Sequence, residues 1–112
     1  MHEQSIVESL LAVALDHAKK ANATRVLKIH VVVGELSGAV DEAMSFYFGF
    51  LSKNTIASGA VLSFEHVPAR FRCRSCNTTF SSKGDFLCPQ CKDRQVEIVG
   101  GRELYVDSLE VD

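Results

Sequence analysis

The sequence predicts an α+β fold in which two helices lie on one face of a three-stranded sheet and a zinc-ribbon domain is inserted before the last strand. Two segments carry apolar residues at helical spacing, and three others alternate apolar and polar residues as strands do. Two Cys-x-x-Cys pairs lie together between the second and third strand segments. Helices packed on one side of a sheet provide the two layers that a small domain needs to bury its apolar faces.

The first helix is predicted from the segment "SIVESLLAVALDHAKKA", whose apolar residues recur on one side. Ser5 and Glu8 would form a capping box, although a start nearer Glu3 fits the pattern equally well. The second helix is predicted from "VDEAMSFYFGFLS", with Asp41 near its start as an N-terminal charge or cap. We interpret its aromatic stripe as core packing.

The strands are predicted from "RVLKIHVVVGE", "GAVLSFEHV" and "ELYVDSLEV". In the last segment the apolar parity changes at Asp107 and Ser108, which indicates a bulge. The predicted division places residues 1–67 and 99–112 in an α/β domain and residues 68–98 in a metal-binding insertion. The order of the elements does not decide how the strands pair.

Composition excludes several classes of protein. Of the 112 residues, 46% are hydrophobic and 23% are charged, which is typical of a folded globular chain. No apolar run approaches the roughly 18 residues of a membrane span, and the first twenty residues do not resemble a secretory signal. We therefore expect a cytoplasmic protein, whose cysteines are more suited to metal binding than to disulfides.

The four cysteines form the strongest motif in the chain. "CRSC" at 73–76 and "CPQC" at 88–91 supply four thiolates from two tight knuckles, the tetrahedral shell that structural zinc prefers. Because the segment has little apolar mass, the metal must supply much of its folding free energy, on the order of 10 kcal/mol. Iron in the same cage, thiol–disulfide exchange and a nucleic-acid-binding ribbon are alternatives that the spacing leaves open.

Charge argues against nucleic acid. Residues 68–98 hold six bases and three acids, and a zinc ion with four thiolates would reduce their formal +3 to about +1. The whole chain has a net charge of -2. The three phenylalanines of the segment are as compatible with a small core as with base stacking: Phe71, Phe80 and Phe86. An enzyme finds little support, since there is no phosphate loop, nucleophile motif or open metal position.

The N-terminus offers a second kind of metal site. The α-amine of Met1, the amide and imidazole nitrogens of His2 and the amide of Glu3 are adjacent, and together they can form a plane of four nitrogens. This geometry suits nickel(II) or copper(II) better than zinc. On these three residues alone the competing interpretation is a solvated tail.

The whole pattern resembles the HypA/HybF family of hydrogenase maturation nickel metallochaperones. The resemblance rests on "MHE" at the N-terminus, "VVVGELS" after the first helix, the two cysteine knuckles, and the closing "LYVDSLEV". It implies a protein that carries nickel to the large subunit of nickel-iron hydrogenase together with a GTPase partner, and that is not an enzyme. Some members of the family also serve urease maturation, and whether the chain forms a homodimer is left open.

The resemblance also implies roles for individual residues. His2 would be the principal nickel ligand, and Met1 and Glu3 would support it. Asp41 resembles an acidic position near the nickel site of the family. The zinc ligands would be Cys73, Cys76, Cys88 and Cys91.

Overall fold

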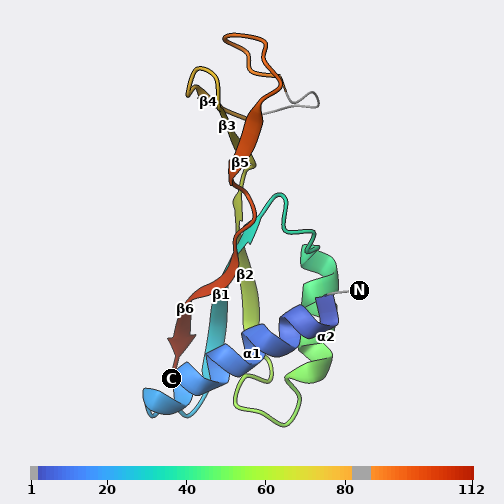
Figure 1. Cartoon of the computed structure of the whole chain (residues 1–112). Coiled ribbons are helices and arrows are strands. Elements are labelled where there is room, and N and C mark those ends of the chain that lie inside the picture. Colours follow the sequence, from blue (N-terminus) through green and yellow to red (C-terminus); the bar gives the residue numbers. More distant parts are fainter. Residues whose placement is uncertain (1–2, 82–86) are drawn as a thin grey trace. The chain divides into compact units, whose positions relative to one another are not determined.

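A computed structural model of the chain describes residues 3–81 and 87–112 (Figure 1). The chain forms two compact units. The first, here called the helical unit, comprises Met1–Val32, Gly38–Glu65 and Leu104–Asp112. The second, here called the cysteine unit, comprises Val33–Ser37 and His66–Glu103.

Helix α1 spans Glu3–Lys20, so it begins nearer Glu3 than the Ser5 capping box would place it. Its buried residues recur at intervals of three and four along one face: Val7, Leu11, Ala14 and Ala18. The helix ends in a Schellman motif, because the Ala23 N–H donates to the Ala18 carbonyl at 2.9 Å and the Asn22 N–H to the Lys19 carbonyl at 3.0 Å. Asn22 has a φ of 56°, the left-handed conformation that this motif requires.

Strand β1 (Val26–Gly34), helix α2 (Asp41–Leu51) and strand β2 (Val61–Val67) form a parallel crossover unit. The Val26 N–H donates to the Ile56 carbonyl just before β2, and the Glu35 N–H donates to the Val67 carbonyl at its end, so both strands run the same way. Strand β6 (Leu104–Val111) pairs on the other side of β1, giving the order β2-β1-β6. Its direction is opposite, since Asp112 bonds to Arg25 at the start of β1.

The core of the helical unit lies between the helices and this sheet. Helices α1 and α2 contact each other, and α1 also contacts β6 (Figure 1). The inward residues Ile29 and Val31 of β1 are each 1% exposed, and Met44 of α2 is fully buried. The predicted α+β architecture of two helices and a three-stranded sheet is confirmed.

The aromatic residues of α2 are divided between two faces. Phe48 is 5% exposed and belongs to the core, whereas Phe46 and Phe50 are 71% and 59% exposed. Val40 precedes the helix as its N-cap residue and is itself exposed. Asp41 is therefore the first helical residue, and its charge lies in the first turn, where it interacts favourably with the helix dipole.

The cysteine unit contains a second, antiparallel sheet in the order β4-β3-β5. Strand β3 (Arg70–Cys73) lies between β4 (Thr79–Phe80) and β5 (Val96–Gly100). Phe71 of β3 pairs with Phe80 of β4, and their rings stack at 5.8 Å between centroids. Arg70 pairs with Gly100 and Phe71 with Ile98, so Val99 is the extra residue of a β-bulge.

The "VGELS" stretch forms a tight crossing with the chain near residue 101, within the cysteine unit. The Gly34 N–H donates to the Glu103 carbonyl and the Leu36 N–H to the Gly101 carbonyl, each at 2.6 Å. The Glu35 carboxylate accepts from the Ala69 N–H at 2.7 Å. A Cβ at Gly34 would lie only 2.2 Å from the Gly101 oxygen, so no larger residue fits there without movement.

Candidate metal centres

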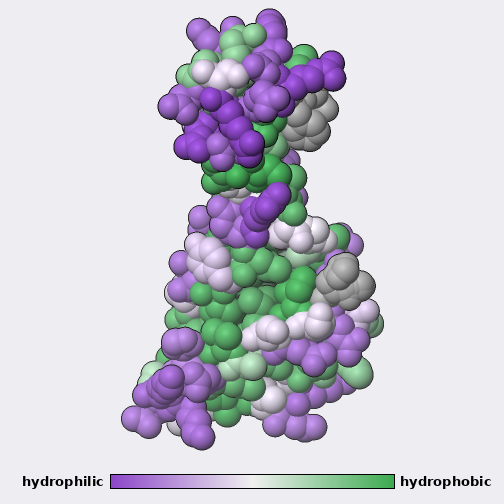
Figure 2. Space-filling model, viewed as in Figure 1, coloured by the Kyte–Doolittle hydropathy of each residue, from purple (hydrophilic) through white to green (hydrophobic). Residues whose placement is uncertain are grey.

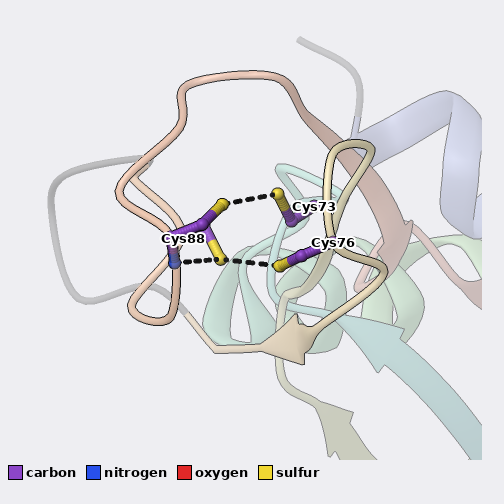
Figure 3. Close-up of side chains that lie close together, drawn as sticks. Cys73, Cys76 and Cys88 are labelled. Atoms are coloured by element: carbon purple, nitrogen blue, oxygen red, sulfur yellow. Dashed lines mark hydrogen bonds between the residues drawn. The ribbon is translucent and has the colours of Figure 1, made fainter.

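The structure brings all four cysteines of the two knuckles together. Their sulfur atoms all lie within 4.8 Å of one another, and Figure 3 shows the sulfurs of Cys73, Cys76 and Cys88 pointing toward a common space. The Cys73 and Cys91 sulfurs are 3.5 Å apart, as are those of Cys76 and Cys88. Four sulfurs placed tetrahedrally at about 2.3 Å from a zinc ion would be separated by about 3.8 Å, so the arrangement fits such an ion closely.

The two knuckles have the same backbone geometry. In the first, the Asn77 N–H donates to the Cys73 carbonyl at 2.8 Å; in the second, the Lys92 N–H donates to the Cys88 carbonyl at 2.9 Å. Asn77 and Lys92 both have a φ of 64°. This left-handed residue after each second cysteine turns the chain so that both thiols of a pair face the same point.

The first cysteine of each pair is anchored and the second is accessible. Cys73, at the end of β3, and Cys88 are both fully buried, whereas Cys76 and Cys91 are exposed. The sulfur of Cys88 accepts backbone hydrogen bonds from Gln90 at 3.4 Å and Cys91 at 3.5 Å, which stabilise negative charge on sulfur. The site is therefore held by the fold on one side and open on the other.

A polar contact joins the two knuckles. Ser75, inside the first knuckle, donates to the Asp93 carboxylate at 2.5 Å, and that carboxylate also accepts from the Gln95 N–H at 3.1 Å. These hydrogen bonds, first that of Ser75 and then that of Gln95, lower the pKa of Asp93. Because Asp93 stays ionised, it fixes the spacing of the knuckles around the sulfurs.

The pKa values of the two exposed thiols are shifted in opposite directions. The hydroxyl and backbone of Thr78 lower the pKa of Cys76 to about 6, in spite of some desolvation. For Cys91 the hydrogen bond from Asp93 lowers the pKa, but Cys73, desolvation and the other two thiols outweigh it and raise the value to about 12. Four adjacent thiolates repel one another, so a divalent cation that takes all four sulfurs would stabilise the ionised form of the whole set.

The donor set and its geometry fit zinc as a structural ion. Four thiolates in a tetrahedron leave no coordination position for a substrate or water, which distinguishes such a site from a catalytic one. When bound, the ion would supply cross-links between the two knuckles. Within residues 3–81 and 87–112, these cysteines form the one group of three or more His, Cys, Asp or Glu side chains with the spacing of a metal site.

The predicted nickel site is only partly within the described residues. Met1 and His2 lie outside them. Glu3 is the first residue of α1 and is partly buried, and Asp41 is the first residue of α2, also partly buried. Figure 1 draws the N-terminal end of α1 beside α2, and the two helices are in contact.

The histidine of strand β1 has a structural partner. The His30 ring nitrogen lies 2.8 Å from the Glu110 carboxylate across the β1 and β6 pair. This hydrogen bond, with a further contribution from Lys28, lowers the pKa of Glu110.

No helix in the described part of the chain has the length and apolarity of a membrane span.

Fold and site together define a small α+β protein with a four-cysteine ribbon as its candidate metal centre. Residues 1–111 match the family described as "Hydrogenase/urease nickel incorporation, metallochaperone, hypA". The chain belongs to the HypA family.

Members of this family are similar to the chain over its whole length. The chain is 44% identical to hydrogenase maturation factor HypA of Dehalococcoides mccartyi strain CBDB1, covering all of this chain and 95% of that protein. It is 40% identical to the HypA protein of Caldanaerobacter subterraneus, with full coverage of both. The solution structure of the nickel metallochaperone HypA from Helicobacter pylori aligns with a TM-score of 0.71 at 28% identity, over 99% of this chain and 97% of that one.

Sequence reasoning did not identify the contact between Ser75 and Asp93 or the left-handed residues Asn77 and Lys92. A weak signal was present for Asn77, because asparagine tolerates positive φ more readily than most residues. Lys92 carries no such signal, and only the matching hydrogen bonds of the two knuckles reveal its role.

Proposed function

We propose that this protein binds nickel(II) at its N-terminus and delivers it to the large subunit of nickel-iron hydrogenase in the cytoplasm, together with a GTPase partner. The observation that carries the proposal is the match of residues 1–111 to a nickel-incorporation family, in a chain that begins Met-His-Glu. The metal would be cargo, so the protein would act as a carrier and not as an enzyme. The family description also includes urease, so urease maturation proteins are possible recipients of the same nickel.

The start of α1 at Glu3 suits a chelate built from backbone nitrogens. The first N–H groups of a helix have no acceptor in the helical hydrogen-bond ladder, so a metal that replaces the Glu3 amide proton breaks no helical bond. A chelate of one amine, one imidazole and two deprotonated amides around nickel(II) has no net charge. The positive end of the helix dipole therefore does not oppose it.

Glu3 and Asp41 would contribute from outside the plane of nitrogens. Each is the first residue of its helix, with its carboxylate in the first turn, and α1 and α2 contact each other. We assign both a supporting role, with His2 as the principal ligand and the Met1 amine as the nitrogen that fixes the position of the chelate.

The four cysteines would hold structural zinc. The grouping of the four sulfurs within 4.8 Å of one another supports this assignment, and a closed shell of four thiolates would count against catalysis by the ion. The proposed division keeps residues 68–98 as the zinc-binding domain and assigns 1–67 and 99–112 to nickel binding. Zinc would hold the small domain folded while nickel is loaded and released elsewhere.

A nucleic-acid-binding ribbon is less consistent with the described residues. Phe71 is 3% exposed and stacks on Phe80, so these two rings form a small core and do not present a face to bases. Phe86 lies outside the described residues.

The test removes the amine from the chelate. Acetylating the N-terminus should abolish the four-nitrogen chelate, because an acetylated nitrogen no longer acts as an amine ligand. Nickel titrations by calorimetry and absorbance should then show a large loss of affinity and of the absorption band of square-planar nickel. His17→Ala is the matched control, since it removes a histidine of α1 without touching the chelate.

The pH dependence provides a second readout. Two amide protons leave when the metal binds, so affinity should rise at least about a hundredfold per pH unit near neutrality. N-terminally acetylated protein with unchanged affinity and spectrum would refute the chelate. Metal analysis of protein purified with and without added nickel, beside His2→Ala, should show one zinc per chain throughout and nickel only in the wild type.

A further inference from the structure

One face of the cysteine-unit sheet carries a ladder of arginines. The burial of β3 alternates, so Phe71 and Cys73 point into the small core while Arg70 and Arg72 point to solvent. Arg74 follows on the same side as Arg72, because both approach the same oxygen of Glu97. Figure 2 shows strongly hydrophilic residues gathered over this unit.

Within the described residues, the arginines of this face outnumber the carboxylates that contact them. Arg72 donates to the Glu97 carboxylate through Nε at 3.2 Å and Nη2 at 2.6 Å, and Arg74 lies 3.9 Å from the same oxygen. The hydrogen bond from Arg72 lowers the pKa of Glu97, and the charges of both arginines add to the effect. Among residues 3–81 and 87–112, Arg70 donates a hydrogen bond to the neutral hydroxyl of Thr79, at 3.5 Å. Two guanidinium groups, those of Arg72 and Arg74, thus share the Glu97 carboxylate.

Glu97 shows how the face binds an acidic group. Arg72 is 45% exposed and Arg74 63% exposed at the side chain, so both retain donors that can reach further carboxylates. Alternate residues of a strand are about 6.6 Å apart, and an extended peptide with an acidic residue at every second position repeats its carboxylates at the same distance. The ladder and such a peptide match in both charge and period.

Nucleic acid is the competing anion, and the structure disfavours it. Phe71 and Phe80 pack on each other in the core, and Phe71, the neighbour of Arg70 and Arg72, faces the opposite way from them. A single strand bound along this face would therefore lack their rings to stack on.

We infer that the face formed by Arg70, Arg72 and Arg74 is a docking surface for an extended acidic segment of a partner protein. Carboxylates at alternate positions of that segment pair with successive arginines, and Glu97 occupies part of the surface until it is displaced. The inference is independent of nickel at the N-terminus, so His2→Ala protein should bind the acidic segment as the wild type does.

The probe is a fluorescein-labelled peptide, Glu-Ser-Glu-Ser-Glu-Ser, measured by anisotropy with full-length zinc-loaded protein at low salt. The triple variant Arg70→Gln, Arg72→Gln, Arg74→Gln should bind at least about tenfold more weakly. The matched control Lys19→Gln, Lys20→Gln, Arg25→Gln removes the same charge from the helical unit and should change affinity less than about twofold. The glutamine counterpart of the peptide should not bind.

Two single variants distinguish the loss of a docking surface from misfolding of the chain next to Cys73. Glu97→Gln frees Arg72 and Arg74, and it should strengthen peptide binding by about threefold or more. Arg70→Gln lies three residues from the nearest cysteine and should weaken it by about threefold, with one zinc per chain retained. Equal losses in the two triple variants, a hexathymidine oligonucleotide that binds more tightly than the peptide, or no saturable binding of the peptide would each overturn the inference.

Discussion

Replacing Gly34 with alanine should destabilise the chain crossing in the cysteine unit. The added Cβ would meet the Gly101 oxygen at 2.2 Å and the Glu103 nitrogen at 2.6 Å, whereas real Cβ atoms essentially never approach within 3.0 Å. Relief requires a movement of about 1 Å, because both contacts are with backbone. That movement would break the two hydrogen bonds of the crossing, Gly34 to Glu103 and Leu36 to Gly101.

The magnitude follows from these two bonds and the strain. Each hydrogen bond contributes about 1 kcal/mol net, and residual overpacking typically costs about 1 kcal/mol or more. Gly34 is not among the residues with positive φ, so alanine can adopt its backbone conformation. Alanine also loses less backbone entropy on folding than glycine, which offsets about 0.5–1 kcal/mol of the destabilisation. We expect the free energy of opening at this crossing to fall by about 2–3 kcal/mol.

Amide hydrogen exchange measures this change locally. The Leu36 amide, which donates to Gly101, should exchange about 30 to 150 times faster in the variant, since 1.4 kcal/mol corresponds to a factor of ten. Gly49→Ala is the control: nothing lies within 4 Å of its added Cβ in α2, and it should stabilise the protein by about 0.5–1 kcal/mol. Exchange at Leu36 within threefold of the wild type would refute the argument from the clash.

Cys73→Ala should abolish stoichiometric zinc and unfold the cysteine unit while most of the helical circular dichroism remains; retention of one zinc per chain would show that the ligand set is wrong. Ser75→Ala removes the donor to Asp93 and should weaken zinc about tenfold in competition with a chromophoric chelator, and an unchanged affinity would leave that contact without a role in metal binding. His30→Ala should raise the carboxyl pKa of Glu110 back toward 4.5 in an NMR titration. Because the pKa of Glu110 is lowered in the folded protein, the stabilisation by this pair is present above pH 4.5 and is lost as the pH falls through the folded pKa. Equal pKa values of Glu110 in the wild type and the variant would contradict the prediction.

The family relationship and the proposed nickel site depend on different evidence. The match over residues 1–111 establishes the family, whereas the chelate at Met1 and His2 rests on the chemistry of adjacent nitrogens. What the structure adds is the start of α1 at Glu3, which leaves the amide of that residue outside the helical hydrogen-bond ladder. Measuring nickel binding by N-terminally acetylated protein separates the two, because acetylation removes the amine ligand and changes no residue of the family fold.

Local patterns were sufficient to predict the helices and the three strands of the larger sheet. Apolar spacing identified both helices and the strands β1, β2 and β6, since the period of side-chain burial differs between helix and strand. The parity change at Asp107 is visible in the burial of β6, where Val106 and Leu109 are the more buried residues on either side. The two Cys-x-x-Cys pairs predicted the metal site because each pair forms its own turn and needs little help from distant residues.

Tertiary structure alone decided the rest, because the deciding contacts join residues far apart in the chain. The parallel pairing of β1 with β2 depends on hydrogen bonds to residues 56 and 67, which no periodicity reveals. A side chain at position 34 would collide with the backbone of Gly101, so this position requires glycine. The sequence shows a glycine in a strand but does not show which distant residue lies against it. Likewise, the sequence shows arginines at every second position, but only the packing of Phe71 and the approach of Glu97 show that they share one exposed face.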